Sequence, residues 1–302
     1  MSLDADARVD RFRLKRKLIF WRVLALVILV AAILFAAGRF VPGFGDYVAR
    51  IDVEGVIVDD EARDRLLADI HNDARAKALI VHIDSPGGTV VGGEKLYRQL
   101  RRIAEKKPVV AVMGQLATSA GYMTAIGADW IIAQEGTVTG SIGVILQTPQ
   151  IVGLMEKLGI KMTIVKSSPL KAVPNPFEPL SERGREATKA VVDDMYDMFV
   201  SMVVERRKLD RPRVLELADG RIYTGRQAKT SGLVDALGGM RTAREWLDVN
   251  HKVSQQLPVR LRKADRPGGW SWVARALLGR NAALVERVSL DGLVSVWHPA
   301  LR

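Results

Sequence analysis

The chain has 302 residues, a formal net charge of +11 and no cysteine. This length allows one large domain or two smaller ones. The absence of cysteine excludes disulfide bonds, thiolate metal sites and a cysteine nucleophile. The charge lies at the ends: residues 1–22 carry a net +4, residues 251–302 a net +6 and residues 23–250 only +1. A nearly neutral body lacks the basic stripe of a nucleic-acid-binding domain, so we expect no nucleic-acid partner.

The first predicted element is a membrane helix. Residues 18–37 are apolar apart from Arg22, and about 20 apolar residues cross a bilayer as a helix. Six basic residues precede this segment, so the positive-inside rule places the body on the outer, periplasmic side of the cytoplasmic membrane. We predict a basic cytoplasmic segment over 1–17 and a single-pass transmembrane anchor over 18–41. A signal peptide cleaved near Gly38 is the alternative, which the long charged region disfavours.

The residues after the anchor alternate between predicted strands and helices, which indicates an α/β fold with mostly parallel strands and flanking helices. Gly55 marks a bulge or turn in the first strand, and Ser181 suits the N-cap of the longest helix. Strands are expected at 49–58, 78–83, 109–113, 130–133, 163–166 and 257–261, and helices at 61–76, 92–106, 119–126, 151–158 and 181–208. We place the catalytic body at 42–250.

Residues 251–302 form a basic C-terminal tail of different character. The segment from Trp270 to Val296 is amphipathic and combines aromatic with basic residues, which is typical of a helix at a membrane interface. Packing of this tail on the body or on a neighbouring subunit is an equally good interpretation.

Two turns in the body carry the features of a reactive site. The sequence Asp84-Ser85-Pro86-Gly87-Gly88 follows one apolar run, and the sequence Ala117-Thr118-Ser119-Ala120-Gly121-Tyr122 follows another. Two strand ends that converge in this way can present a serine hydroxyl beside free backbone N–H groups, which is the geometry that acyl transfer requires. Ordinary turn chemistry is the alternative, because glycine and proline are common in turns.

A serine nucleophile needs a base, and the four histidines are poor candidates. His71 lies on a predicted helix and is expected to be exposed, His82 lies within a strand, and His251 and His298 belong to the tail. Lysine is the other choice, provided that burial lowers its pKa from about 10.4 towards neutrality.

Among the lysines, Lys171 fits this requirement, since no acidic residue lies within six positions on either side. Lys166 is the nearby rival, and Lys161 opens a predicted strand and is expected to be exposed.

Four motifs in order carry a family resemblance over about residues 48–250. They are Asp84–Gly88, Thr118–Tyr122, Thr139–Val144 and Tyr223–Ala228, the last continuing to Asp235. With them the chain resembles the family of short-form bacterial signal peptide peptidases A, which are serine proteases of the ClpP/crotonase-like fold.

The resemblance implies a role for each site residue. Ser119 would be the nucleophile and Lys171 its base, oriented by Ser141, and the backbone N–H groups of Gly88 and Ala120 would stabilise the oxyanion. The sequence departs from the family pattern at two positions. Ala120 stands where the family often has glycine, and no acidic residue follows Lys171, where the family often has one. No cofactor and no metal is implied.

The resemblance also implies partners. The substrates would be cleaved signal peptides and other membrane-associated peptides, reached at the lipid bilayer. The chain would form a homo-oligomeric ring, with an octamer as one size, in which neighbouring protomers can share serine and lysine.

Three other functions compete with the Ser-Lys endopeptidase. They are a crotonase-like acyl-thioester enzyme, a non-catalytic membrane scaffold of the same fold, and a ClpP-like Ser-His-Asp protease. The last is disfavoured because no histidine lies between Ser119 and His251.

Overall fold

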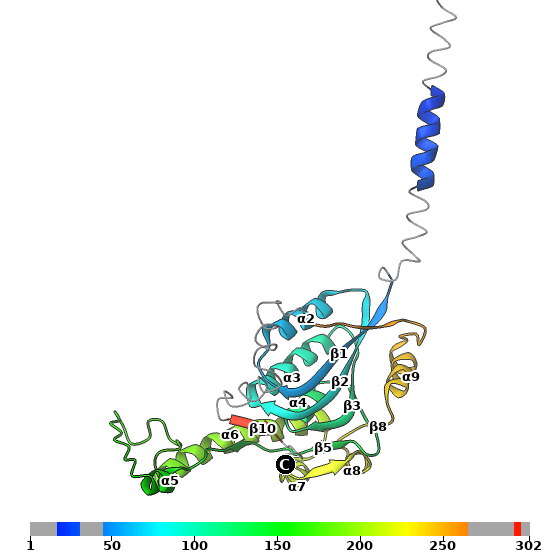
Figure 1. Cartoon of the computed structure of the whole chain (residues 1–302). Helices are drawn as coiled ribbons and strands as arrows, with labels where there is room; N and C mark the ends of the chain where they lie inside the picture. Colours follow the sequence, from blue (N-terminus) through cyan, green and yellow to red (C-terminus); the bar gives the residue numbers. More distant parts are fainter. Residues whose placement is uncertain (1–16, 31–44, 265–292, 297–302) are drawn as a thin grey trace, which may run out of the picture. The chain divides into compact units, whose positions relative to one another are not determined.

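The computed structural model describes residues 17–30, 45–264 and 293–296 (Figure 1). The chain divides into two compact units, residues 1–46 and 47–302. In the first unit, residues 17–30 form a helix with mostly exposed side chains. Within the described residues, no helix is both long and apolar enough to span a membrane. Residues 31–41 of the predicted anchor lie outside the described part, so the anchor stays a prediction.

The second unit is built on one largely parallel sheet. At its centre lie three strands paired in parallel: β1 (Tyr47–Ile57), β2 (Ala76–Thr89) and β3 (Val109–Thr118). Parallel pairing adds β9 (Val259–Leu261) beside β1, β4 (Trp130–Ala133) and β5 (Val138–Gly140) beside β3, and β8 (Ala236–Leu237) beside β4. Antiparallel pairing adds β7 (Ile222–Thr224) beside β5, and β10 (Leu293–Val296) beside both β2 and β6 (Ile145–Leu146).

Helices cover both faces of this sheet, because successive strand residues point to opposite sides and both sets are apolar. The larger core packs one face against α2, α3, α4 and α6, and the smaller core packs the other face against α9. The described helices of this unit are α2 (Glu61–Asn72), α3 (Val90–Ala104), α4 (Ala120–Ala125), α5 (Val152–Lys157), α6 (Glu182–Arg207), α7 (Arg211–Leu217), α8 (Gly225–Ser231) and α9 (Met240–His251).

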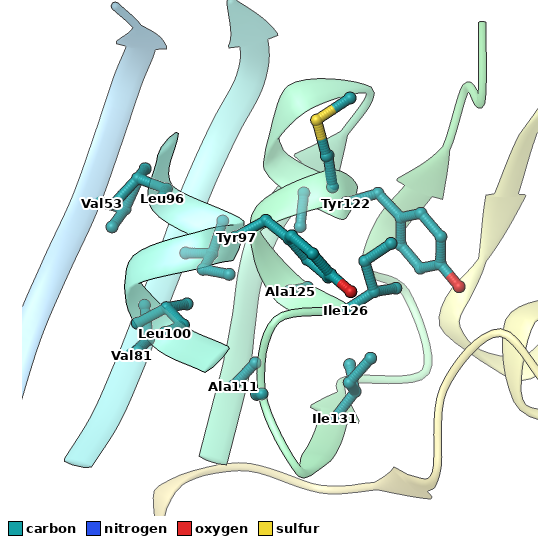
Figure 2. Close-up of a cluster of buried hydrophobic side chains, with 14 of the residues drawn as sticks. Val53, Val81, Leu96, Tyr97, Leu100, Ala111, Tyr122, Ala125, Ile126 and Ile131 are labelled. Atoms are coloured by element: carbon teal, nitrogen blue, oxygen red, sulfur yellow. The ribbon is translucent and has the colours of Figure 1, made fainter. Parts of the chain in front are cut away.

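The larger core fixes α3 and α4 on the sheet. Figure 2 shows Leu96 of α3 lying over Val53 of β1, and both side chains are buried. Tyr122 of α4 is fully buried, and its hydroxyl donates a hydrogen bond of 2.9 Å to the backbone oxygen of Leu233. Burial of a large ring with a satisfied hydroxyl anchors a short helix strongly. Because α4 begins directly after Ser119, this packing also fixes the backbone of that serine.

The structure confirms the α/β fold with mostly parallel strands. It also confirms the irregularity at Gly55, which has a φ of 68° beside a shift in strand register. Ser181 caps α6, since its hydroxyl accepts the N–H of Gly184 at 3.1 Å. The predicted ends of the second and third strands are wrong. β2 and β3 continue to Thr89 and Thr118, because neighbouring strands keep pairing with both of them beyond a bulge.

Three further predictions fail for tertiary reasons. Residues 163–166 are not a strand, since no described strand lies beside them to pair with. His71 is buried rather than exposed, because α2 packs its side chain against α3. Residues 293–296 form a strand rather than the end of an amphipathic helix. The predicted helical part over 270–292 lies outside the described residues, and the predicted domain boundaries stay predictions.

Candidate active site

Ser119 occupies a strained turn between β3 and α4. Its φ and ψ are 55° and −117°, a region that residues other than glycine rarely adopt. Two backbone hydrogen bonds hold it there: its N–H donates to Gly140 at 2.8 Å, and its carbonyl accepts from Met123 at 2.8 Å. Strain of this kind persists only where the surroundings impose it, and it is common at active sites. A sharp turn from strand to helix is one known way to present a nucleophile.

The hydroxyl of Ser119 has an unmet hydrogen-bonding capacity. The residue is only 1% exposed, and its Oγ has no hydrogen-bond partner within the described residues. Ser119 also lines a cleft of about 440 Å³. A buried polar atom without a partner calls for an explanation, and a catalytic role supplies one.

Ser141 lies beside the same cleft. It follows β5 with a φ of 49°, and its N–H donates to the backbone oxygen of Arg221 at 2.8 Å. The structure therefore brings together two predicted site residues that are 22 positions apart in the sequence, because β5 pairs in parallel with the end of β3.

The segment that ends in Gly88 is held tightly next to Ser119. The Ser85 hydroxyl donates to the carbonyl of Gly55 at 2.6 Å and accepts the N–H of Gly87 at 3.1 Å. The Thr118 hydroxyl donates to the carbonyl of Pro86 at 3.0 Å, which ties this segment to the residue before the serine.

The two predicted oxyanion donors occupy distinctive backbone positions. A Cβ on Gly88 would lie 1.8 Å from the carbonyl oxygen of Ile57, so only glycine fits in this backbone. Ala120 is the first residue of α4, where an N–H has no acceptor inside the helix. The oxyanion assignment stays a prediction that this geometry permits.

Lys171 is not in the cleft of its own chain. It lies between α5 and α6 with an exposed side chain, and it is absent from the residues that line the cleft. The loop that carries it is ordered by hydrogen bonds from the Lys171 N–H to Ser168 O at 3.1 Å and from the Asn175 side chain to Ala172 O at 2.8 Å. In Figure 1, α5 and this loop lie at the end of α6 that points away from the sheet.

The rival Lys166 has a carboxylate partner. Its side chain is 14% exposed and forms an ion pair with Glu178, which also accepts a hydrogen bond from Asn175. The hydrogen bonds from Lys166 and Asn175 lower the pKa of Glu178. Because its ammonium is engaged by Glu178, Lys166 is badly placed to act as the base of Ser119.

Two other basic residues show that burial alone does not identify the base. Lys107 is 9% exposed, and burial lowers its pKa. However, its ammonium donates to the carbonyls of Ile70 and Asp73 at 2.7 and 2.8 Å, so it caps the end of α2 instead. Neither Lys107 nor His82 lines the cleft.

The sequence analysis missed the far wall of the cleft. This wall comes from α6 and from the turn before β7, and its residues are Val192, Asp193, Tyr196, Ala218, Asp219 and Gly220. The α6 residues of this wall, the half-buried Val192 and Tyr196 with the exposed Asp193, carry no motif that points to this role. A strained, buried serine lies at a strand-to-helix turn, lines a cleft and adjoins a glycine segment that Thr118 holds in place. This arrangement is typical of a serine hydrolase.

Comparison with known proteins identifies the family. The model of "Peptidase family S49" matches residues 101–254. A provisionally named protease of Synechocystis sp. is 42% identical over 200 residues, which cover 66% of this chain and 72% of that protein. A provisionally named signal peptide peptidase SppA of Enterococcus faecium is 33% identical over 226 residues, covering 74% of this chain and 66% of that protein. The chain belongs to peptidase family S49 and is a serine peptidase of the SppA type.

Other relatives are more distant or aligned over less of their length. A provisionally named protease of Methanocaldococcus jannaschii is 38% identical, and the alignment covers 63% of this chain and 61% of that protein. Among solved structures, a mutant of the membrane-bound stomatin-specific protease 1510-N matches with a TM-score of 0.49 and 15% identity, covering 73% of this chain and 99% of that chain. A ClpP1 mutant of Listeria monocytogenes matches with a TM-score of 0.43 and 17% identity, covering 64% and 92%. Scores this low carry no further argument.

Proposed function

We propose that this S49 peptidase is a membrane-anchored endopeptidase that hydrolyses peptide bonds with Ser119 of one protomer and Lys171 of a neighbouring protomer. One observation carries this proposal. Among the described residues, no lysine lines the cleft that holds Ser119, while the predicted base Lys171 is exposed on the loop between α5 and α6.

The reaction follows from these positions. When Lys171 of a second copy enters the cleft, its neutral amine accepts the hydroxyl proton of Ser119 while Oγ attacks the scissile carbonyl. The N–H groups of Gly88 and Ala120 then receive the developing oxyanion. The proton passes to the leaving amine, and water hydrolyses the resulting ester. Ser141 lines the same cleft and can hydrogen-bond the incoming amine.

The arm, defined as residues 151–180, supports an assembly of several copies. Its apolar side chains are strongly exposed, and Val165 is 93% exposed. The exposed apolar residues of the arm include Leu154, Leu158, Ile160, Met162, Ile164 and Phe177. An exposed apolar surface of this kind is expected to be buried against a partner. If each copy contacts the next in the same way, the copies form a closed ring when the rotation that relates neighbouring copies adds up to a full turn. Contact with a neighbour would also supply the shelter from water that a lysine base requires.

The substrates are proposed from chemistry and from the family. We propose cleaved signal peptides and other membrane-associated peptides, because the sequence before the body combines a basic segment with an apolar stretch near a bilayer core in length. We propose that the peptidase lies at the cytoplasmic membrane, with its body on the outer side. The alternative of a crotonase-like acyl-thioester enzyme is disfavoured by the match to a peptidase family.

Subunit complementation tests the shared dyad. Chains with Ser119→Ala and chains with Lys171→Ala are expected to be inactive alone, with the assembly intact. Mixed and reassembled, they should regain about a quarter of the wild-type activity, because random assembly pairs an intact serine with an intact lysine at that frequency. As a control, Ser119→Ala mixed with a chain carrying both substitutions should stay inactive. No recovery in the mixed assembly would rule out a dyad shared between copies, and hydrolysis by Ser119→Ala alone would rule out the nucleophile.

A further inference from the structure

The α6 wall of the cleft places one carboxylate beside an aromatic ring. Val192, Asp193 and Tyr196 line the same cleft as Ser119. Residues three and four apart on a helix are neighbours on its surface, so Tyr196 lies next to both Asp193 and Val192. The Tyr196 hydroxyl donates to the backbone oxygen of Ala218 at 2.8 Å, which holds the ring in place. The wall therefore presents a fixed ring and an acidic group to whatever enters the cleft.

The charged groups that line the cleft are acidic. Among the lining residues that the structure describes, only Asp193 and Asp219 carry a charge. The carboxylate of Asp219 is already engaged, because it accepts hydrogen bonds from the guanidinium of Arg221 at 2.7 Å and from the backbone N–H of Arg221 at 3.1 Å. The charge that remains to act on a substrate is therefore that of Asp193.

The ion pair between Asp193 and Lys189 leaves the carboxylate open to exchange of its partner. The side chains of Lys189 and Asp193 are 70% and 57% exposed. An exposed pair of this kind contributes little, and a lysine four residues before an acid is the less favourable order on a helix. Lys189 is not among the residues that line the cleft. A cation inside the cleft would therefore replace Lys189 as the partner of Asp193.

We propose that Asp193 is a specificity-determining residue that binds a lysine or arginine side chain of the peptide substrate. The assignment rests on the proposed peptidase function and adds a substrate preference to it. The aliphatic stem of such a side chain can lie along Val192 and the Tyr196 ring, while its cationic head bonds to the carboxylate. The face of the ring also attracts a cation. Signal peptides fit this preference, because a positively charged segment adjoins their apolar stretch.

Paired peptides measure the preference. The two fluorogenic peptides of a pair are identical except that one carries lysine and the other the uncharged norleucine, and successive pairs place this residue at successive positions around the scissile bond. At the position that enters the cleft, Asp193→Asn should lower the ratio of kcat/KM for the lysine peptide to that for the norleucine peptide by about 3- to 10-fold. The ratio compares two substrates on the same enzyme, so any loss of folded protein cancels.

The neighbouring residue Asp194 supplies a matched control. It is an exposed aspartate on the same helix, but it does not line the cleft. Asp194→Asn should therefore keep the wild-type ratio. If Asp193→Asn left the ratio unchanged at every position, or if Asp194→Asn lowered it equally, the proposal would be overturned.

Binding without hydrolysis separates this inference from the peptidase proposal. In the full-length Ser119→Ala chain, fluorescence polarisation with the same peptides gives their Kd values. Adding Asp193→Asn should weaken binding of the lysine peptide by about 3- to 10-fold more than that of the norleucine peptide. Equal weakening of both would overturn the inference, even if the wild type hydrolyses both peptides. If the wild type hydrolyses neither peptide while the lysine peptide binds through Asp193, the proposed function fails and the cation site stands.

Discussion

The hydrogen bond from Thr118 to Pro86 offers a direct test of how the site is held together. Thr118 is fully buried, and its hydroxyl donates to the Pro86 carbonyl at 3.0 Å. This bond joins the residue before the nucleophile to the segment that carries Gly88. Thr118→Val has nearly the same shape but cannot donate, so the carbonyl of Pro86 loses this partner.

The magnitude follows from the loss of one partner in a buried hydrogen bond. Such a loss costs about 1–3 kcal/mol of the free energy of unfolding. In a domain of this size, each kcal/mol lowers Tm by about 2–4 °C. If the Gly88 segment shifts relative to Ser119, the oxyanion loses a well-placed donor, and kcat should fall by about 10- to 100-fold with little change in KM.

Thermal unfolding and steady-state peptide hydrolysis measure the two effects. Thr230→Val is a matched control, because the Thr230 hydroxyl bonds to the Arg226 carbonyl within the exposed surface of α8. That variant should keep wild-type kcat and nearly wild-type Tm. A Thr118→Val protein with both wild-type Tm and wild-type kcat would refute the view that this hydrogen bond positions the two halves of the site.

Two further predictions concern other charged groups. Lys171→Arg should abolish peptide hydrolysis, because a guanidinium does not release its proton. Lys166→Ala should reduce the rate of hydrolysis far less. If Lys166→Ala lost more activity than Lys171→Arg in a hydrolysis assay, Lys166 would be identified as the base. For Asp73, burial raises the pKa, but hydrogen bonds from Arg75 and Tyr47 outweigh it and lower the pKa from 3.8 to about 2. This depressed pKa contributes about 2 kcal/mol to stability at neutral pH, present above about pH 4 and lost as the pH falls towards 2. In urea unfolding, the stability difference between wild type and Asp73→Asn should therefore shrink over that range, and a constant difference would contradict the assignment.

The turn that carries the candidate nucleophile could be predicted from the sequence because its signal is local. A serine among small residues directly after an apolar strand has few structural options, and the structure places Ser119 at such a turn. The strands and helices up to residue 133 could also be predicted in order, because apolar periodicity determines which face each element buries. The elements after α6, namely α7, β7, α8, β8 and α9, were not predicted. The strand ends were not readable, because β2 continues past Ile83 only while β1 and β3 pair with it.

The choice between the two lysines shows where sequence reasoning stops. The absence of nearby acidic residues favoured Lys171 over Lys166, and the ion pair between Lys166 and Glu178 agrees with that choice. Yet Glu178 is 12 residues from Lys166 in the sequence, so the pattern of neighbours could not reveal this contact. Nor could it reveal that Lys171 stands exposed and outside the cleft of its own chain.

From the sequence alone, the class of fold and the family could be determined and Ser119 could be chosen as the candidate nucleophile, since each depends on short motifs or on apolar periodicity. Only the tertiary structure decided which groups meet: Ser119 with Ser141 in one cleft, and Leu293–Val296 beside Gly88. The physical reason is that strand pairing and packing join residues far apart in the chain, and their free energies depend on partners that no local stretch of sequence specifies.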